Sequence, residues 1–158
     1  GSSYQYRMEA FMQDGKEQFV QKNIYGLAKQ AAGDLLKAIA IKYNIHFNKV
    51  LFTNVFGIGD YSTRSTNTFI KQLLSGEDLR LIDGEHKHDW IYIDDAVQGM
   101  LAILKKGNNG MSYYVGNRKL NSFREIITEV RDILSPKAGL YFGCYDDNGY
   151  IDYSQIDL

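Results

Sequence analysis

Residues 23–59, NIYGLAKQAAGDLLKAIAIKYNIHFNKVLFTNVFGIG, contain a helical pattern followed directly by a strand pattern. Apolar residues recur at spacings of three and four along the first part, at Ile24, Leu27, Ala28, Ala31, Leu35 and Ile39. This spacing predicts an amphipathic helix over 23–43, with Asn23 as its N-cap. The short apolar run 47–56 predicts a buried strand that ends at Gly57 and Gly59. A helix followed by such a strand is a building unit of α/β proteins.

Beyond this stretch the chain continues to alternate between helical and extended patterns. Helical segments are expected at 67–75, 95–106 and 123–134, and strands at 79–82, 90–93, 111–115 and 140–145. Gly76 is the expected C-terminal cap of the first of these helices, and Asp94 or Asp95 is the expected N-cap of the second. Ser122 and Glu125 have the spacing of a capping box at the start of the third. The alternation predicts the α/β fold class.

The two ends of the chain give weaker patterns. The first 20 residues have no clean period and predict a loop-rich segment. Near the other end, Asn148-Gly149 stands between the extended segments 140–145 and 150–153. This dipeptide suits a hairpin turn or an ordinary loop, and both interpretations stay open.

Composition excludes several classes of protein. The chain has 158 residues, 18 Lys+Arg against 19 Asp+Glu and 44% hydrophobic residues, as in one ordinary folded domain or most of one. Because the net charge is −1, there is no electrostatic reason to expect a nucleic-acid or membrane-surface partner. No apolar run approaches the roughly 18–20 residues that span a bilayer. Cys144 is alone, so an intrachain disulfide is excluded, and we expect a cytoplasmic protein.

The most specific chemical signal is the pair Tyr25 and Lys29 near the start of the long helix. Residues four apart lie on one helical face, so the phenol and the ammonium are neighbours. A nearby cation favours the phenolate, and such a phenol can act as general base towards an alcohol or general acid towards a ketone. Tyr-x-x-x-Lys is also a common chance spacing on a solvated face, and other segments are needed to decide between the two interpretations.

Three further segments follow this pair in a characteristic order. They are Thr53-Asn54-Val55-Phe56-Gly57-Ile58-Gly59-Asp60, the stretch 83–97 (DGEHKHDWIYIDDAV) and Ser112-Tyr113-Tyr114-Val115-Gly116, with Gly1-Ser2-Ser3 ahead of the pair. In this order they resemble the later half of the extended short-chain dehydrogenase/reductases, the NAD-dependent epimerase/dehydratase family that acts on nucleotide sugars. The resemblance covers nearly the whole chain.

The resemblance implies a fold and a division of the chain. The fold is the later part of a doubly wound, Rossmann-like parallel sheet plus a small C-terminal substrate domain. Residues 1–60 would be the end of the dinucleotide-binding sheet, and 61–158 mostly the substrate-binding domain, with helix 95–106 returning to the sheet. No G-x-x-G-x-x-G lies between a strand and a helix. We therefore expect the sequence to begin near the end of the fifth strand and the isolated chain to be inactive.

The resemblance also implies roles for individual residues. Tyr25 would be the catalytic acid/base, Lys29 would stabilise its phenolate and hold the nicotinamide ribose, and Ser2 with Ser3 would orient the reacting oxygen. The expected contacts to the cofactor, NAD or NADP, come from Tyr25, Lys29, Phe52, Thr53, Asn54 and Val55. The expected contacts to a nucleotide-sugar substrate come from Asn54, Arg64, Lys87 and His88. Gly1-Ser2-Ser3 also matches a tag remnant, so that alternative stays open.

Departures from the family pattern limit these expectations. His88 stands where the family has an arginine, and an imidazole is a poor substitute for a guanidinium on a diphosphate. Tyr4-Gln5 stands where dehydratases have Asp-Glu, so epimerase or reductase chemistry is favoured. His86 and His88 lack a third ligand of characteristic spacing, so no metal site is predicted. A non-catalytic domain that binds a sugar nucleotide or a protein partner is the alternative function, and a homodimer is left open.

Overall fold

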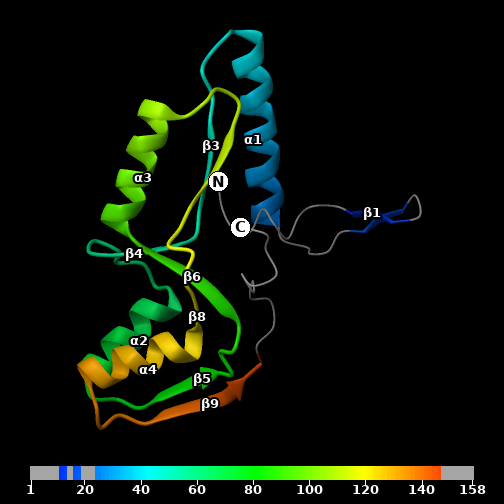
Figure 1. The fold of residues 1–158 in the computed structure, drawn as a ribbon. Helices are drawn as coiled ribbons and strands as arrows, with labels where there is room; N and C mark the ends of the chain where they lie inside the picture. The colour runs from blue at the N-terminus through cyan, green and yellow to red at the C-terminus, as the bar shows by residue number, and fades with distance from the viewer. Residues whose placement is uncertain (1–10, 14–15, 19–23, 147–158) are drawn as a thin grey trace. The chain divides into compact units, whose positions relative to one another are not determined.

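The computed structural model describes residues 11–13, 16–18 and 24–146 (Figure 1). Its helices are α1 (Ile24–Lys42), α2 (Ser65–Leu74), α3 (Ile93–Lys106) and α4 (Phe123–Leu134). Its strands are β1 (Phe11–Gln13), β2 (Lys16–Gln18), β3 (Lys49–Phe52), β4 (Asn54–Phe56), β5 (Leu79–Ile82), β6 (Lys87–Tyr92), β7 (Ser112–Val115), β8 (Leu120–Ser122) and β9 (Leu140–Tyr145). Helices and strands alternate, which confirms the predicted α/β class. The described residues form two compact units, unit 1 within 1–55 and 90–118 and unit 2 within 56–89 and 119–157.

Unit 1 is organised by the parallel pairing of β3 with β7. The register runs from Lys49 opposite Ser112 to Phe52 opposite Val115. Successive side chains of β3 point to opposite faces of the strand. Val50 and Phe52 share one face and pack against a hydrophobic cluster that contains residues of α3. The members of this cluster are Ile91, Ala96 and Val115, with Val50, Phe52, Val55 and Ile103 against them. Parallel strands covered by helices are the arrangement of doubly wound folds.

Helices α3 and α1 flank these two strands (Figure 1). On α3, a Cβ built at Gly99 would lie 2.8 Å from Cγ1 of Val115, so only glycine permits this close approach to β7. On α1, Lys49 Nζ donates to Gln30 Oε1 at 3.0 Å, and Gln30 Nε2 donates to Asp34 at 3.1 Å. These bonds connect α1 to the β3 residues that point away from α3, because Lys49 and Val50 lie on opposite faces of the strand.

The helix predicted over 23–43 is confirmed as Ile24–Lys42, but its apolar stripe does not form the inner face. The buried residues of α1 are Gly26 and Ala40, while Ile24 and Leu35 are 82% and 62% exposed. Gly33 is half-buried and lies seven residues from each of Gly26 and Ala40, on the same side of the helix. Small residues therefore face the strands, and the large aliphatic stripe faces outward from the described core.

Unit 2 has its own hydrophobic core between parallel strands β5 and β9 and helices α2 and α4. Its buried members are Leu73, Leu79, Leu81, Phe123, Ile127 and Ala138. The antiparallel pair β6 and β8 places Lys87 opposite Ser122 and His88 opposite Asn121. Strand β6 is central in the three-stranded order β4-β6-β8.

The helix ends confirm two capping predictions and correct a third. Gly76 adopts φ 76° after α2 and donates to the carbonyl of Leu73, as expected of a glycine cap. The capping box is present at α4, where the N–H of Glu125 donates to Ser122 Oγ. The prediction of Asp94 or Asp95 as N-cap of α3 is wrong, because the helix begins at Ile93 with Tyr92 as N-cap. Both carboxylates instead lie in the first turn, where their negative charge interacts favourably with the helix dipole.

Two strand predictions also need correction. The run 47–56 is not one strand, because the chain breaks at Thr53 and β4 joins β6 while β3 pairs with β7. The segment expected to be loop-rich contains the antiparallel pair β1 and β2, with Phe11 opposite Gln18. Strands of three residues are held together by backbone hydrogen bonds, and they are too short to show a hydrophobic period in the sequence. Asn23, Asn148-Gly149 and 150–153 lie outside the described residues.

The capping box predicts a pH dependence of stability. The backbone N–H of Ser122 and the ammonium of Lys87 hold the pKa of Glu125 below its ordinary value of 4.5. A lowered folded-state pKa stabilises the protein above the ordinary value, and this stabilisation is lost as pH falls through the lowered pKa. Glu125→Gln should therefore lower the Tm at pH 7, and its difference from the wild type should close below about pH 4.5.

Circular dichroism melts between pH 3 and pH 8 measure this, with Glu129→Gln on the same helix as the control. Glu129 is exposed and lies outside the capping box, so its variant should follow the wild-type curve. A Glu125→Gln difference that stays constant across this pH range would contradict the assignment.

Candidate functional site

Tyr25 and Lys29 lie side by side on the first turns of α1. The Nζ atom of Lys29 is 5.5 Å from the centroid of the Tyr25 ring, and Tyr25 is 53% exposed. The spacing of four residues produces this contact within the helix, as expected from the sequence. An exposed phenol beside an ammonium can exchange a proton with a bound hydroxyl or carbonyl group.

A second lysine and tyrosine pair, at the C-terminal end of α1, makes the same kind of contact. Lys42 Nζ lies 5.4 Å from the ring centroid of Tyr43, which is also exposed. This pair is adjacent in sequence and belongs to the opposite end of the helix. The contact between an ammonium and a tyrosine ring therefore occurs at both ends of α1. It does not by itself distinguish Tyr25 from Tyr43 as the candidate acid/base.

The expected cofactor-binding residues of the second segment surround the break between β3 and β4. Phe52 and Val55 pack against the core cluster of unit 1, so their side chains have a structural role. Thr53 is buried and its N–H donates to the carbonyl of Val115. Asn54 begins β4. Strands β3 and β7 end together here, and ligands of open parallel sheets bind beyond the carboxyl ends of the strands.

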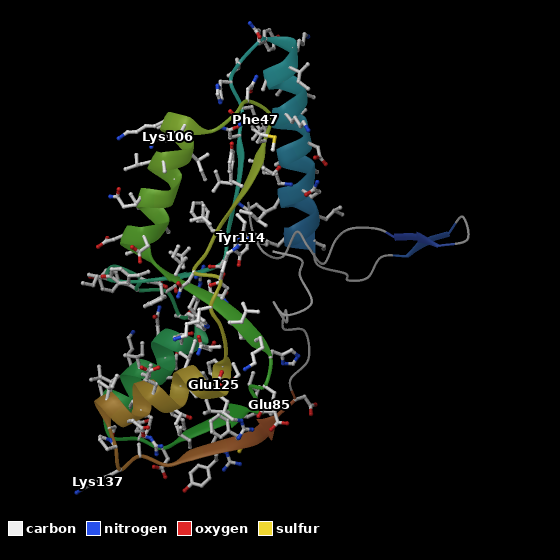
Figure 2. The ribbon with its side chains drawn as sticks, viewed as in Figure 1. Phe47, Glu85, Lys106, Tyr114, Glu125 and Lys137 are labelled. Atoms are coloured by element: carbon white, nitrogen blue, oxygen red, sulfur yellow. The ribbon has the colours of Figure 1, made fainter. Side chains whose placement is uncertain are left out.

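The basic residues expected to contact substrate belong to unit 2. Arg64 is the N-cap residue of α2. Lys87 Nζ pairs with Glu125 Oε2 at 3.2 Å, and the two side chains are 41% and 55% exposed. His88 is half-buried and lies opposite Asn121. Lys87 thus has an anchored position at the start of β6, and Figure 2 labels its partner Glu125 on α4.

Sequence reasoning did not identify Arg124, which organises the segment before Lys87. Its guanidinium pairs with Asp83 Oδ1 at 3.0 Å and with Glu85 Oε1 at 2.7 Å, and it stacks 4.0 Å from the Phe142 ring centroid. Gly84 between the two acids adopts φ 72°. In the sequence, the only sign of this arrangement is the pair of acids on either side of Gly84. Their partner Arg124 lies some forty positions further along the chain, so a local pattern does not reveal it.

The loop that leads into α2 is held by Asp60 and Asn67. Ser62 donates from its backbone N–H to Asp60 Oδ1 at 3.0 Å, and Asn67 Nδ2 donates to the carbonyls of Asp60 and Ser62. Hydrogen bonds from the Ser62 side chain and backbone lower the pKa of the Asp60 carboxyl group. The loop therefore carries Arg64 on a fixed turn.

The remaining expectations concern the N-terminal residues, metal ligands and membrane-spanning helices. Ser2, Ser3, Tyr4 and Gln5 lie outside the described residues. Across 11–13, 16–18 and 24–146, no three His, Cys, Asp or Glu side chains are grouped to hold a metal ion. In the same part of the chain, no helix is long and apolar enough to cross a membrane.

Residues 1–116 match the NAD dependent epimerase/dehydratase family. The chain belongs to this family. The match covers the Tyr25 and Lys29 pair, the break at Thr53 and the whole of β6, α3 and β7. The resemblance derived from the ordered motifs is therefore confirmed.

Relatives and solved structures agree with this membership. The chain is 27% identical over 128 residues to CDP-abequose synthase of Yersinia pseudotuberculosis, covering 78% of this chain and 44% of that protein. The UDP-N-acetylglucosamine 4-epimerase of Methanobrevibacter ruminantium superposes with a TM-score of 0.76 at 22% identity, covering 96% and 50%. The dTDP-glucose 4,6-dehydratase of Streptomyces venezuelae, solved with NAD, superposes with a TM-score of 0.70 at 20% identity, covering 88% and 43%.

These superpositions confirm the Rossmann-like α/β fold. The chain spans less than half the length of this curated relative, since it covers 44% of CDP-abequose synthase. The family description names NAD as the cofactor of its members.

Removing the amide of Asn67 should loosen the loop that carries Arg64. Asn67→Ala deletes the bonds to Asp60 and Ser62, so we expect a loss of about 1 kcal/mol in the free energy of unfolding. Hydrogen exchange at the Ser62 amide should become faster. Thr68→Ala is the control, since Thr68 Oγ1 donates to the Arg64 carbonyl and not to the turn at Asp60. Unchanged exchange at Ser62 in Asn67→Ala would contradict this role.

Proposed function

We propose that this chain is the later portion of an NAD(P)-dependent nucleotide-sugar epimerase or reductase in which Tyr25 is the acid/base. The observation that carries the proposal is the exposed Tyr25 phenol beside the Lys29 ammonium, on α1 of a chain that belongs to this family. Tyr25 as phenolate accepts the proton of a sugar hydroxyl, and in the reverse direction its phenol protonates the ketone. Lys29 stabilises the phenolate, and Ser2 with Ser3 orients the reacting oxygen.

The residues of unit 1 fit a nicotinamide cofactor. The ammonium of Lys29 suits a ribose hydroxyl, and the buried polar side chain of Thr53 stands at the shared carboxyl end of β3 and β7. Phe52, Asn54 and Val55 complete the segment assigned to the cofactor. When bound, the nicotinamide supplies hydride transfer at the sugar carbon.

The proposal that the chain is part of a larger fold has structural support in α1. Its stripe of Ile24, Leu27, Leu35 and Ile39 is exposed, whereas the buried residues of this helix are Gly26 and Ala40. Parallel sheets in α/β proteins are larger than two strands and are covered on both faces. The chain also spans only 44% of the length of CDP-abequose synthase. We assign residues 1–60 to the cofactor-binding part and 61–158 mostly to the substrate-binding part.

The basic residues and the names of the relatives support a nucleotide sugar as the substrate class. Arg64, Lys87 and His88 supply the groups for a phosphate, and Asn54 supplies an amide for the sugar. The epimerase and dehydratase named above carry nucleotide sugars in their names. His88 replaces the family arginine, so Lys87 is the main cation proposed for the diphosphate. Tyr4-Gln5 at the dehydratase Asp-Glu position favours epimerisation or reduction over dehydration.

NAD(H) titration distinguishes this proposal from a non-catalytic binding domain. The 158-residue chain lacks a glycine-rich dinucleotide turn and should bind NAD(H) without measurable affinity. The complete protein in which this chain occurs should bind it. A complete protein that binds sugar nucleotide but no dinucleotide would support the non-catalytic alternative.

Substitution of the proposed acid/base should remove catalysis without removing cofactor binding. Tyr25→Phe keeps the ring and deletes the hydroxyl, so kcat of the complete protein should fall roughly 10²–10⁴-fold with little change in NAD(H) affinity. Lys29→Ala should lower both kcat and NAD(H) affinity, because the same ammonium serves both. Steady-state kinetics and calorimetric titration measure the two effects.

Lys42 and the following Tyr43, at the C-terminal end of α1, offer matched controls. Tyr43→Phe and Lys42→Ala alter the same types of side chain in the same type of contact, and both should leave kcat within about twofold. Wild-type turnover in Tyr25→Phe would leave the proposal without its central residue.

Lys87 should affect substrate binding more than stability. Its ion pair with Glu125 is exposed, and exposed pairs contribute little to stability, so Lys87→Ala should barely change the Tm. Loss of a charge-assisted bond to phosphate should weaken nucleotide-sugar binding by roughly tenfold or more. Lys71→Ala, which removes an exposed lysine from α2, is the control. Equal affinity in Lys87→Ala and the wild type would exclude this contact.

A further inference from the structure

Unit 1 contains a cavity of about 270 Å³ at the amino ends of β3 and β7. It is bordered by the last turns of α1, by the connection from α1 to β3 and by the turn before β7. Its lining residues are Lys37, Ala40, Ile41, Asn44, Ile45, Phe47, Asn109 and Gly110. Phe47, which Figure 2 labels, belongs to the connection that leads into β3 at Lys49. The residues proposed for the cofactor follow the carboxyl ends of the same strands, so the cavity lies at the other edge of the pair.

Hydrogen bonds fix the walls of this cavity. Asn44 adopts φ 52° after α1, and the N–H of Ile45 donates back into the last turn of the helix at 2.8 Å. The N–H of Gly110 donates to the carbonyl of Phe47 at 2.8 Å. The N–H of Phe47 in turn donates to Asn109 Oδ1 at 2.8 Å. The connection after α1 and the turn before β7 are therefore bonded to each other, and the cavity is formed without a ligand.

The polar groups of the lining favour a negatively charged ligand. The side-chain oxygen of Asn109 already accepts the N–H of Phe47, which leaves its amide nitrogen to donate. Lys37 supplies an ammonium group and Asn44 supplies a second amide. None of the lining residues in the described part of the chain is acidic. The cavity thus offers hydrogen-bond donors and one positive charge.

The end of α1 opposes an anion less than an ordinary helix end does. The last carbonyls of a helix carry partial negative charge. Here the carbonyls of Ile39, Ala40 and Ile41 all accept hydrogen bonds from the backbone N–H groups that follow Lys42. Lys37 has no hydrogen-bond or ion-pair partner among the described residues, so its ammonium does not serve these carbonyls. The charge of Lys37 is available to a ligand.

We propose that this cavity binds a small monocarboxylate with an apolar body, at a site separate from the proposed cofactor and substrate sites. The carboxylate pairs with the ammonium of Lys37 and accepts hydrogen bonds from the amides of Asn44 and Asn109. The apolar body packs against Phe47 and Ala40. A single ammonium matches one negative charge, which favours a monocarboxylate over a diphosphate. Pockets for drug-sized ligands begin at about 300 Å³, so a volume just below that limit suits a small molecule.

Benzoate and benzamide are the probes, because they share a ring and differ in charge. In NMR titrations of the complete protein, benzoate should shift the amide resonances of Ile45 and Gly110 saturably. Benzamide should bind about five- to tenfold more weakly, because it lacks the charge that pairs with Lys37. Lys37→Gln should weaken benzoate binding by about the same factor, five- to tenfold, and should leave NAD(H) affinity unchanged.

Two further variants separate ligand contacts from effects on the fold. Asn44→Gly removes an amide at a position where glycine readily adopts the observed φ of 52°. It should weaken benzoate binding by about threefold with little change in the Tm. Lys42→Gln is the matched control, since the ammonium of Lys42 lies over the Tyr43 ring and does not line the cavity. Its benzoate affinity should stay within about twofold of the wild type, because no bond to the ligand is lost.

Each outcome decides the proposal. Absence of saturable benzoate binding would overturn it, as would equal affinity for benzoate and benzamide or equal benzoate affinity in Lys37→Gln and the wild type. An equal loss in Lys42→Gln would show a general charge effect and would also overturn it. Competitive displacement of benzoate by NAD⁺ or by a nucleotide sugar would assign benzoate to the cofactor or substrate site instead. The proposed function is tested separately by NAD(H) titration, so its failure does not change these expectations.

Discussion

Parallel pairing of β3 with β7 is the constraint on which unit 1 depends. Because Phe52 lies opposite Val115, the two strands end at one edge, and the next residues of the chain are the polar Thr53 and Asn54. The same pairing requires helices on both faces, since parallel strands in α/β proteins are buried on both sides. Helix α3 meets this requirement by the close approach that Gly99 allows. The register of β3 with β7 thus determines that Thr53 and Asn54, which are proposed to contact the cofactor, stand directly after the end of both strands.

Helix α1 has two different faces, one formed by small residues and one by large aliphatic side chains. Gly26 and Ala40 are its buried residues, Gly33 on the same side faces the Lys49 side chain of β3, and the bond between Lys49 and Gln30 joins the two elements. Its larger aliphatic side chains are exposed in the part of the chain that the structure describes. The contact of Tyr25 with Lys29 depends only on the first turns of this helix, because the two residues are four positions apart.

Unit 2 depends more on polar anchoring. The capping box at α4 uses the Glu125 carboxylate twice, for the N–H of Ser122 and for the ammonium of Lys87. Arg124, the preceding residue, holds the segment from Asp83 to Glu85 by two ion pairs. One helix start therefore positions both the approach to β6 and the lysine proposed for substrate. The hydrophobic core beneath it is separate from that of unit 1.

The sequence by itself determined the features that depend on neighbours within a few positions. Helix α1, the contact of Tyr25 with Lys29 and the capping box of Ser122 were predictable, because helical geometry joins residues three or four apart. The ordered motifs also identified the family, whereas the roles of the site residues stay predictions. Only the tertiary structure decided which face of α1 is buried, where the strand breaks at Thr53 and what Arg124 binds. These features depend on partners far along the chain, and the energy of such contacts is absent from any local pattern.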